Sequence, residues 1–354
     1  MMFLLPVGGG GGGAHSVMQE ADAMIGLGID VSIACNSINV ERLRQGYRDL
    51  PRIQAHIQGF ANPAELGKLI GDTKRDVVIA TTNQSVHTLA EALETMPQDH
   101  NLRFGYYIQD YEPLFYDKSS EDWAKAYTSF GLIPGMVHFA KTSWLQEVTS
   151  LNHNVPVQKV LASIDHAVYY PDLAYRMAPR EKVTVAAMVR PATPRRAPRR
   201  TVRILNRLAA EHGDTVSCLA FGCHPEELAA DDLQLAGVEN VGVLGRRGVG
   251  DLFRKVDLFL DLSDYQAFGR TAIEAMSCGV ISVVPVHGGA HEFAVHGTNS
   301  FVVDVRSDDD IMNAVSIFLS MAAADRTRMA RMAINAGYKY TPELAALSEI
   351  ELFL

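Results

Sequence analysis

Short apolar runs alternate with amphipathic stretches over the first 164 residues of the chain. The runs are FLLPV, DVSIAC, DVVIAT, RFGYYIQ, GMVHFAK and VQKVLASI, and residues 15–27 show the helical period between two of them. Runs of this length fit buried strands, and helical stretches between strands are typical of βαβ units. Because each such unit returns the chain to a parallel neighbour, we expect a parallel sheet.

The same alternation resumes in the second half of the chain. Its apolar runs are KVTVAAMV, VSCLAFG, NVGVLG, DLFLDL, GVISVVPV and SFVVD. Residues 198–211 and 250–256 have the pattern of helices between these runs. We therefore expect a second parallel sheet with helices around it.

Chain length supports two domains rather than one. A chain of 354 residues is long enough for each half to bury its own core. Between the halves, prolines and mixed charges occur without a clear period, which is typical of a linker. The fold class predicted is α/β, with Rossmann-like domains over residues 1–168 and 182–340, a linker over 169–181 and a terminal amphipathic helix over 341–354.

The composition is that of a globular protein and argues against two kinds of function, nucleic-acid binding and zinc binding. Hydrophobic residues make up 47% and charged residues 21%, as in ordinary soluble globular proteins. A net charge of −9 argues against a nucleic-acid-binding protein, since such proteins neutralise phosphates with basic side chains. The four cysteines lack the C-x-x-C spacing of zinc sites.

The placement of the chain in the cell is an expectation from the same data. No apolar run reaches the roughly eighteen residues that span a bilayer, and the start, MMFLLPV, fits a first strand better than a signal peptide. We expect a cytoplasmic protein whose membrane contact, if it has one, is peripheral at the inner membrane face.

One stretch, residues 264–304, carries most of the chemistry. Phe268, Gly269, Arg270 and Thr271 lead into an amphipathic run, so several backbone N–H groups should lie at a helix N-terminus, which attracts anions such as phosphate. Glu274 lies one turn further on, where its carboxylate can accept hydrogen bonds from two adjacent hydroxyls, such as a ribose diol. A phosphate site beside a diol site indicates a nucleotide.

This stretch resembles the donor-site signature of retaining GT-B glycosyltransferases, the group called glycosyltransferase family four, written E-x-F-G-x-x-x-x-E-A-M-A-x-G-x-P-V-V. The matching residues are Phe268, Gly269, Glu274, Ala275, Met276, Cys278, Gly279, Val283 and Val284. One position departs, because Gln266 stands where the family has its first glutamate. An amide keeps the hydrogen-bonding reach, loses the charge and gains an NH2 donor that could face a phosphate or a sugar hydroxyl.

The resemblance implies the GT-B fold, in which two Rossmann-like domains with parallel sheets face each other across a cleft. It also gives the terminal helix a reason to cross back to the N-terminal domain, as such helices commonly do in GT-B enzymes. A helix that caps its own domain is the alternative, and periodicity does not separate the two.

Basic residues follow the first strand of the second half. The family's pattern at this place is G-R-x-x-x-x-K, and the resemblance implies that Arg190 and Arg195 bind the donor pyrophosphate, with Arg196 as an alternative to Arg195. An arginine can replace the lysine because its guanidinium donates in a fork. The arginines further along, Arg199, Arg200 and Arg203, are expected to be solvated or to form a basic patch that faces a membrane.

Six consecutive glycines, residues 8–13, follow the first strand. They formally satisfy G-x-G-x-x-G, but a dinucleotide site also needs an acidic residue after the second strand, where the chain reads Cys35, Asn36 and Ser37. The family carries a Gly-Gly turn at this place that faces the donor phosphates or the acceptor. The glycines carried over to donor binding are Gly11, Gly12 and Gly13.

Asp110 ends the apolar run RFGYYIQ, at the carboxyl edge where α/β proteins bind ligands. Its carboxylate could hold a transferred sugar or orient the acceptor hydroxyl, and a role as a turn or helix cap is equally open. The wording Q-D-Y-E-P also has a weaker resemblance to a subgroup that includes bacterial rhamnosyltransferases.

Three histidines, His287, His291 and His296, lie close together in the sequence, but their spacing does not fit the H-E-x-x-H zinc pattern. No metal site is predicted here. In the family this G-G-x-x-E segment, here Gly288, Gly289 and Glu292, frames the donor site. We expect the backbone near Leu244, Gly245 and Arg246 to recognise the base.

The resemblance implies a retaining transferase that moves a sugar from a nucleoside diphosphate (dTDP, UDP or GDP) to a glycan, lipid-linked or small-molecule acceptor, without a metal or other cofactor. Asp110, Arg190, Arg195 and Glu274 are the expected catalytic residues. A catalytically degenerate binding protein, or a GT-B epimerase or phosphorylase, is the alternative. Donor binding is expected from Gly11, Gly12, Gly13, Arg190, Arg195, Gly245, Arg246, Gln266, Phe268, Gly269, Arg270, Thr271 and Glu274.

Overall fold

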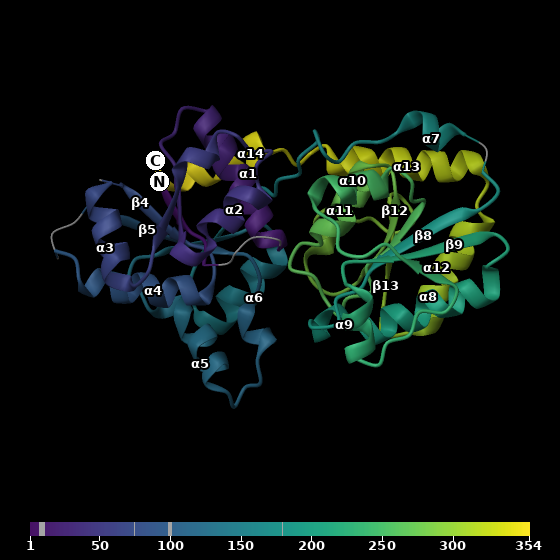
Figure 1. Cartoon of the computed structure of the whole chain (residues 1–354), viewed down its shortest axis with the longest axis horizontal. Helices are drawn as coiled ribbons and strands as arrows, with labels where there is room; N and C mark the ends of the chain where they lie inside the picture. Colours follow the sequence, from purple (N-terminus) through teal and green to yellow (C-terminus); the bar gives the residue numbers. More distant parts are fainter. Residues whose placement is uncertain (7–10, 74, 98–100, 179) are drawn as a thin grey trace. The chain divides into compact units, whose positions relative to one another are not determined.

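The chain folds into two compact units (Figure 1). The N-terminal unit consists of Met1–Ser163 together with Tyr340–Leu354, and the C-terminal unit is Ile164–Lys339. Helix α7 (Leu173–Met177) therefore belongs to the C-terminal unit, although it lies in the segment expected to be a linker. This computed structural model describes residues 1–6, 11–73, 75–97, 101–178 and 180–354.

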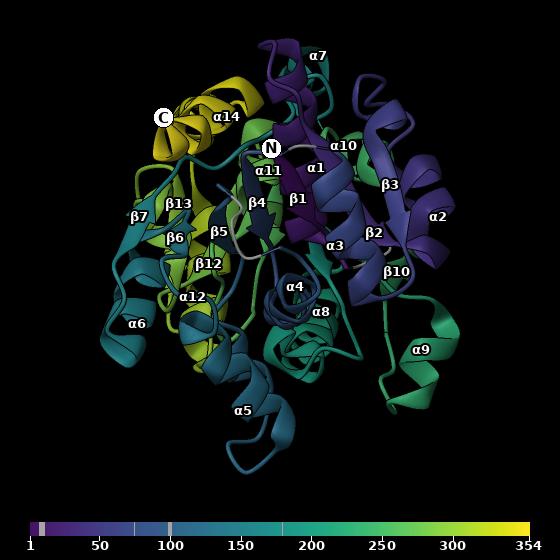
Figure 2. The same cartoon turned by 90° about the vertical axis from the view of Figure 1, so that its left-hand side faces the viewer.

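The N-terminal unit is built on a parallel sheet. In the described ranges the sheet has seven strands in the order β3-β2-β1-β4-β5-β6-β7, and Figure 2 shows them side by side. Strand β1, in the interior of this sheet, is buried on both faces, because Met2, Phe3 and Leu4 are at most 1% exposed. The strands are β1 (Met2–Leu4), β2 (Ser32–Asn36), β3 (Ile57–Phe60), β4 (Val77–Ala80), β5 (Arg103–Ile108), β6 (Val137–Ala140) and β7 (Val157–Lys159).

The helices of this unit begin at well-defined caps. Side-chain oxygens of Asn62, Thr82, Ser120, Thr142 and Thr341 accept a hydrogen bond from the first turn of the helix that follows each of them. The helices are α1 (Gly12–Gly26), α2 (Val40–Gly46), α3 (Pro63–Asp72), α4 (Asn83–Glu94), α5 (Glu121–Thr128), α6 (Ser143–His153) and α14 (Pro342–Ile350).

The terminal helix α14 packs on α1 and brings a carboxyl group into the core of the unit. Glu349 and Glu20 are both completely buried, and the Tyr107 hydroxyl donates to Glu20 at 2.9 Å. The Lys141 ammonium lies 3.6 Å from Glu20. Burial and the neighbouring Glu20 carboxylate raise the pKa of Glu349 well above its usual range. The fold therefore favours the protonated form of Glu349.

The C-terminal unit has a second parallel sheet, with six strands among the residues described, in the order β10-β9-β8-β11-β12-β13. The strands are β8 (Val183–Met188), β9 (Val216–Phe221), β10 (Val238–Asn240), β11 (Leu258–Leu260), β12 (Ile281–Pro285) and β13 (Ser300–Val303). The remaining helices are α8 (Pro198–His212), α9 (Pro225–Ala230), α10 (Arg246–Phe253), α11 (Arg270–Ser277), α12 (Asp308–Ser320) and α13 (Ala323–Gly337).

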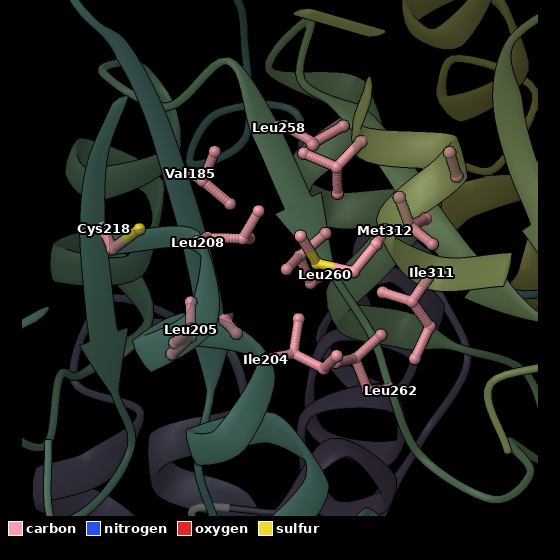
Figure 3. Close-up of a cluster of buried hydrophobic side chains, with 14 of the residues drawn as sticks. Val185, Ile204, Leu205, Leu208, Cys218, Leu258, Leu260, Leu262, Ile311 and Met312 are labelled. Atoms are coloured by element: carbon pink, nitrogen blue, oxygen red, sulfur yellow. The ribbon is translucent and has the colours of Figure 1, made fainter. Parts of the chain in front are cut away.

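The core of this unit lies between the sheet and the helices α8 and α12 (Figure 3). Leu258 and Leu260 of β11 pack with Ile204 and Leu208 of α8 and with Ile311 of α12, and all five are at most 1% exposed. Burying each such side chain contributes about 1.5–3 kcal/mol. The central strand β11 therefore fixes both helices on the same face of the sheet.

The other face of the sheet is covered in part by α11 and α13, which approach each other closely at a glycine. A Cβ atom on Gly337 would lie 2.1 Å from the Ser277 Oγ and 3.1 Å from the Ser277 Cα. The last turn of α13 therefore has no room for a side chain where it crosses α11.

We expect Gly337→Ala to lower the free energy of unfolding by about 1–3 kcal/mol, because the methyl group overpacks this crossing. Urea unfolding followed by circular dichroism measures the change. Gly71→Ala is the matched control, since Gly71 is near the end of α3 and a Cβ there meets nothing within 4 Å. The control should raise stability by about 0.4–1 kcal/mol, and equal effects of the two substitutions would contradict the packing described.

Glu349→Gln tests the buried carboxyl pair. A raised carboxyl pKa in the fold gives a stabilisation that is complete below the usual pKa and is lost as the pH rises toward the raised value. The melting temperature of the parent should therefore fall between about pH 5 and pH 9 more steeply than that of the uncharged variant. Parallel pH profiles of the two proteins, from differential scanning calorimetry, would show that Glu349 does not contribute.

Candidate functional site

The order of strands in the C-terminal sheet creates a site at one edge. From β8 the chain goes outward to β9 and β10, and it then returns to β11 on the other side of β8. Ligands of parallel α/β sheets bind at the carboxyl ends of the strands next to such a reversal. The loops that end there follow β8, β11 and β12, and they contain Arg190 and Arg195, Gln266, and Gly288 respectively.

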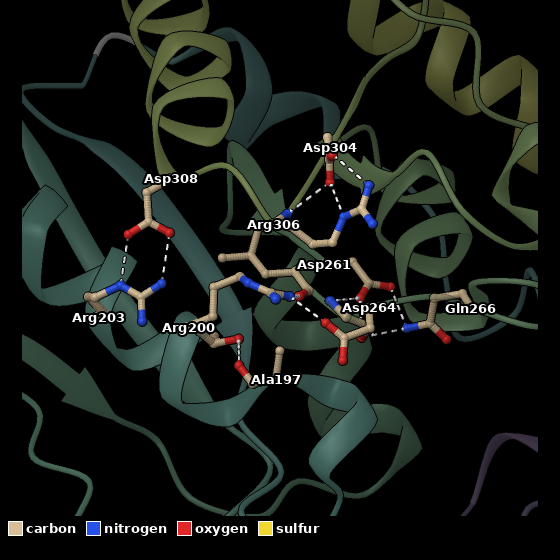
Figure 4. Close-up of polar contacts among 12 residues, drawn as sticks. Ala197, Arg200, Arg203, Asp261, Asp264, Gln266, Asp304, Arg306 and Asp308 are labelled. Atoms are coloured by element: carbon tan, nitrogen blue, oxygen red, sulfur yellow. Dashed lines mark hydrogen bonds and ion pairs between the residues drawn. The ribbon is translucent and has the colours of Figure 1, made fainter. Parts of the chain in front are cut away.

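The Gln266 side chain is held by the loop after β11 (Figure 4). Its Nε2 donates to the Asp261 carboxylate at 2.6 Å and to the Ser263 hydroxyl at 3.0 Å. The Ser263 hydroxyl in turn donates to Asp261 at 2.7 Å, and all three residues are buried. The NH2 group that we expected to face a ligand is therefore used inside the protein.

The backbone at Gln266 is fixed as well. Gln266 forms an isolated bridge with Gly288, and the N–H of Gly289 donates to the Gln266 carbonyl at 2.7 Å. A Cβ on Gly288 would lie 2.2 Å from that carbonyl oxygen, and its φ of +100° is unfavourable for other residues. Gly288 is therefore required for the close approach of the two loops.

The anion-binding end of α11 begins at Gly269. This residue is the N-cap, with φ +92°, and its carbonyl accepts from the N–H of Ala272 at 3.0 Å. Beside it Phe268 packs edge-on against Phe293, with the ring centroids 5.3 Å apart. The amides of Arg270 and Thr271 lie before the first helical hydrogen bond, so they can donate to an anion.

Glu274 is buried one turn into α11 and is paired within its own helix. The Arg270 Nε donates to its carboxylate at 2.7 Å, and the Tyr169 hydroxyl hydrogen-bonds to it as well. Burial raises the pKa of Glu274, while the charges of Arg270 and Arg246 lower it. A ribose diol at this carboxylate would share it with Arg270.

Gly245 and Arg246 begin the neighbouring helix α10. Gly245 is the N-cap, and the Arg246 side chain is buried in an ion pair with Asp165. A Cβ on Gly250 would lie 2.6 Å from the Val168 carbonyl oxygen, so the segment around residue 165 packs tightly along α10. Arg246 is therefore a buried, charge-balanced residue beside α11.

The arginines after β8 fall into two groups. Arg190 is exposed and Arg195 is partly exposed, and the N–H of Asp264 donates to the Arg195 carbonyl at 2.9 Å. Arg200 and Arg203 are instead paired within the unit, with Asp264 at 2.8 Å and with Asp308 at 2.7 Å (Figure 4). These two are therefore neither simply solvated nor part of an uncompensated basic patch.

The residues predicted in the N-terminal unit lie after β1 and β5. Gly11 is the N-cap of α1, which begins with Gly12, and Gly13 lies against Gln109, whose Cγ would be 3.4 Å from an added Cβ. The Asp110 carboxylate accepts from the N–H of Tyr111, its neighbour in the chain, at 2.9 Å. Residues 8–10 of the glycine run are outside the described residues.

The histidines after β12 hold the backbone of their own segment. The His291 Nδ1 lies 2.8 Å from the Gly288 carbonyl, and the His296 Nδ1 lies 2.9 Å from the Val302 carbonyl. In the described part of the chain, no three His, Cys, Asp or Glu side chains gather as a metal site requires. None of the helices there has the length and apolarity needed to cross a membrane.

Four residues of the site were not predicted from the sequence: Asp261, Ser263, Tyr169 and Asp165. The last two approach α10 and α11 only through tertiary packing, so the sequence carries no signal for them. Asp261 and Ser263 do carry one, because they lie five and three residues before Gln266, respectively, at a strand end.

Comparison with known proteins identifies the C-terminal unit. Residues 176–339 match the family described as "Glycosyl transferases group 1". The C-terminal unit belongs to the group 1 glycosyltransferases. The resemblance noted in the sequence is thereby confirmed for this part of the chain.

Curated relatives match parts of this chain and smaller parts of themselves. The O-antigen biosynthesis protein RfbC of Myxococcus xanthus is 28% identical over 202 residues, which are 56% of this chain and 15% of that protein. Mannosylfructose-phosphate synthase of Agrobacterium fabrum (strain C58 / ATCC 33970) is 36% identical over 70 residues, 20% of this chain and 15% of that protein. Sucrose synthase 4 of Oryza sativa subsp. japonica is 34% identical over 80 residues, which are 22% of this chain and 10% of that protein.

Solved structures match the whole length of the chain. Anabaena Alr3699/HepE in complex with UDP and glucose has a TM-score of 0.79 at 16% identity, covering 99% of this chain and 98% of that one. WaaG, a glycosyltransferase involved in lipopolysaccharide biosynthesis, has a TM-score of 0.74 at 14% identity, with coverages of 99% and 98%. At these identities the likeness shows the fold, and the predicted GT-B α/β fold is confirmed.

Arg270→Ala should destabilise the C-terminal unit by about 3–5 kcal/mol, because it leaves the buried Glu274 without its ion partner. The loss should be smaller at acid pH, since the pKa of Glu274 is raised and the protonated carboxyl needs no partner. Urea unfolding at two pH values measures both effects.

The matched control is Arg306→Ala, which removes an ion pair with Asp304 at 2.8 Å on an exposed part of the same unit. Exposed pairs contribute little to stability, because water screens the two charges. If the two alanine variants lost the same stability, the buried pairing of Glu274 would be wrong.

Proposed function

We propose that the chain is a retaining glycosyltransferase, which moves a hexosyl or deoxyhexosyl group from a nucleoside diphosphate sugar to a glycan, lipid-linked or small-molecule acceptor. The observation that carries this proposal is one edge of the C-terminal unit. The N-terminus of α11, Glu274 and the loop after β8 all lie at this edge. Amides and cations at one edge, with a carboxylate one turn away, suit a diphosphate and a ribose.

Each residue has a proposed role at this edge. The amides of Gly269, Arg270 and Thr271 bind the diphosphate, with Phe268 shaping the turn that presents them. Arg190 and Arg195 offset the charge of the diphosphate, and Glu274 accepts from the ribose diol. Gly245 and Arg246 lie beside the base, and Gln266 beside the sugar.

Departure of the diphosphate is the difficult step, because negative charge grows on its oxygen as the bond to the anomeric carbon breaks. Preorganised N–H donors and arginines stabilise that charge without reorganisation, so the mechanism needs neither a protein nucleophile nor a metal. The leaving oxygen takes the proton of the acceptor hydroxyl, and the acceptor oxygen bonds to the anomeric carbon on the same face. Asp110 orients the acceptor hydroxyl, and Gly11, Gly12 and Gly13 give the backbone a close approach to a ligand.

The relatives suggest which donor and acceptor to test first. The Anabaena Alr3699/HepE structures contain UDP and UDP-glucose, which makes UDP the first nucleotide to test, ahead of dTDP and GDP. The names of RfbC and WaaG refer to O-antigen and lipopolysaccharide biosynthesis, which favours a glycan or lipid-linked acceptor. Such an acceptor would fit a cytoplasmic protein with peripheral contact at the inner membrane face.

Gln266 supports a second candidate, a degenerate GT-B protein that binds a glycan or sugar nucleotide without transferring it. The amide lacks the charge of the family's carboxylate, and its NH2 group is committed to Asp261 and Ser263. Slow hydrolysis of a bound sugar nucleotide would exclude this candidate. Mass spectrometry of the products would separate a transferase from an epimerase or a phosphorylase.

A thermal-shift series over UDP, dTDP and GDP tests donor binding. A ligand at about 100 times its dissociation constant stabilises by about 2.7 kcal/mol. Arg190→Ala should weaken binding of the preferred nucleotide by about 10- to 100-fold, since it removes a charge-assisted contact to the diphosphate. Arg328→Ala is the control, because Arg328 is an exposed arginine of α13 paired with Asp325. Equal affinity in the two variants would exclude Arg190 from the site.

Proton NMR of the transfer product tests retention. We expect the new glycosidic bond to have the anomeric configuration of the donor, and Glu274→Ala to abolish transfer in a protein that still folds. A product of inverted configuration would contradict the retaining mechanism, and normal turnover by the variant would exclude Glu274.

A further inference from the structure

The hydrogen bonds of Gln266 define which end of its amide meets a ligand. Both acceptors of its Nε2 are identified: the Asp261 carboxylate at 2.6 Å and the Ser263 hydroxyl at 3.0 Å. A carboxylate accepts hydrogen bonds and cannot donate them, so the NH2 end must face Asp261. The hydroxyl hydrogen of Ser263 is used on Asp261, so that oxygen also acts as an acceptor toward Gln266.

The oxygen end of the amide has a different environment. None of the residues that the structure describes donates a hydrogen bond to the Gln266 Oε1. Figure 4 shows this oxygen on the opposite side of the amide from the bond to Asp261. Oε1 is therefore the atom of this side chain that is available to a ligand.

The loop that holds Asp261 is itself fixed at several points. Arg200 of α8 donates to the Leu262 carbonyl at 2.9 Å and to the Asp264 carboxylate at 2.8 Å. The N–H of Asp261 donates to the Val283 carbonyl at 2.9 Å. With the bridge to Gly288, these contacts hold Asp261 and Gln266 in one geometry, so the amide does not have to reorganise when a ligand arrives.

We propose that Asp261 is a positioning residue that turns the Gln266 amide so that Oε1 faces the donor sugar, and that this pair selects a neutral hydroxyl over a carboxylate on that sugar. The identity of the ligand rests on the proposed function, whereas the pairing does not. Oε1 accepts from a hydroxyl. The Asp261 carboxylate is hydrogen-bonded to the neutral N–H and O–H donors of Gln266 and Ser263, so its negative charge disfavours a second anion nearby. In this chain the carboxylate therefore belongs to Asp261, behind the amide, and not to position 266, where the family has its glutamate.

A charge-swap cycle tests the pairing without any ligand. Gln266→Glu places two carboxylates in contact at a buried position, and we expect the melting temperature at neutral pH to fall by on the order of 5–10 °C. Combining it with Asp261→Asn exchanges the amide and the carboxylate, which restores a single charge and a hydrogen-bonded pair. The double variant should recover at least half of the loss.

The control for the cycle is Asp264→Asn combined with Gln266→Glu. Asp264 is an aspartate in the same loop that pairs with Arg200 rather than with Gln266, so this combination should recover nothing. Recovery in both double variants would show that the fall in melting temperature depends only on net charge, and it would overturn the pairing. A D261N/Q266E protein no more stable than Gln266→Glu would overturn it as well.

Donor selection is measured by calorimetric titration of UDP-glucose against UDP-glucuronate, and of GDP-mannose against GDP-mannuronate. The parent should prefer the neutral sugar by on the order of tenfold, the effect of one correctly oriented hydrogen bond. Asp261→Asn should reduce that preference while UDP or GDP alone binds as in the parent. An unchanged preference in the variant would overturn the selection, and the absence of any nucleotide binding would instead reject the proposed function and leave the swap cycle to decide the pairing.

Discussion

The parallel arrangement of the C-terminal sheet is the constraint on which the site depends. All its strands run in one direction, so every strand ends at the same edge, and the reversal of strand order at β8 and β11 leaves the loops there room to diverge. The sheet is buried by helices on both faces, and its polar groups are concentrated at that edge. Arg190, Gln266 and Gly288 come from three different loops, which the sheet brings to the same edge.

Charge at this edge is balanced inside the protein before a ligand binds. Glu274 is paired with Arg270, and Arg246 with Asp165, in positions with little access to water. Removing one partner of such a pair would leave an uncompensated buried charge, which keeps the pairs intact and the N-termini of α10 and α11 in fixed positions. Folding therefore fixes the backbone amides at the N-terminus of α11 before an anion binds.

Much of the fold could be predicted from the sequence, because the alternation of apolar runs and helical stretches is a local signal. The runs DLFLDL and GVISVVPV became β11 and β12, and Gly269 before an amphipathic run marked the start of α11. Helix α13 was not predicted, since its apolar residues are few and its tight contact with α11 depends on the absence of a side chain at Gly337.

The residues of the candidate site stay a prediction, and the structure adds contacts that the sequence did not indicate. The motif marked Gln266 and Glu274, but the partner of each amide and carboxylate depends on tertiary geometry. Arg270 was expected to offer its backbone to a phosphate, and its side chain also pairs with Glu274 four residues on. Asp165 and Arg246 are 81 residues apart, and a separation of this kind leaves no periodic trace in the sequence.

The central claim is that this edge holds a nucleoside diphosphate sugar and promotes departure of its diphosphate. The most direct measurement is the release of free nucleoside diphosphate, by chromatography, from UDP-, dTDP- and GDP-sugars incubated with the parent chain and with Arg190→Ala. We expect slow release from at least one of these donors even without an acceptor, and its loss in the variant. Binding of none of the donors and release from none would contradict the account.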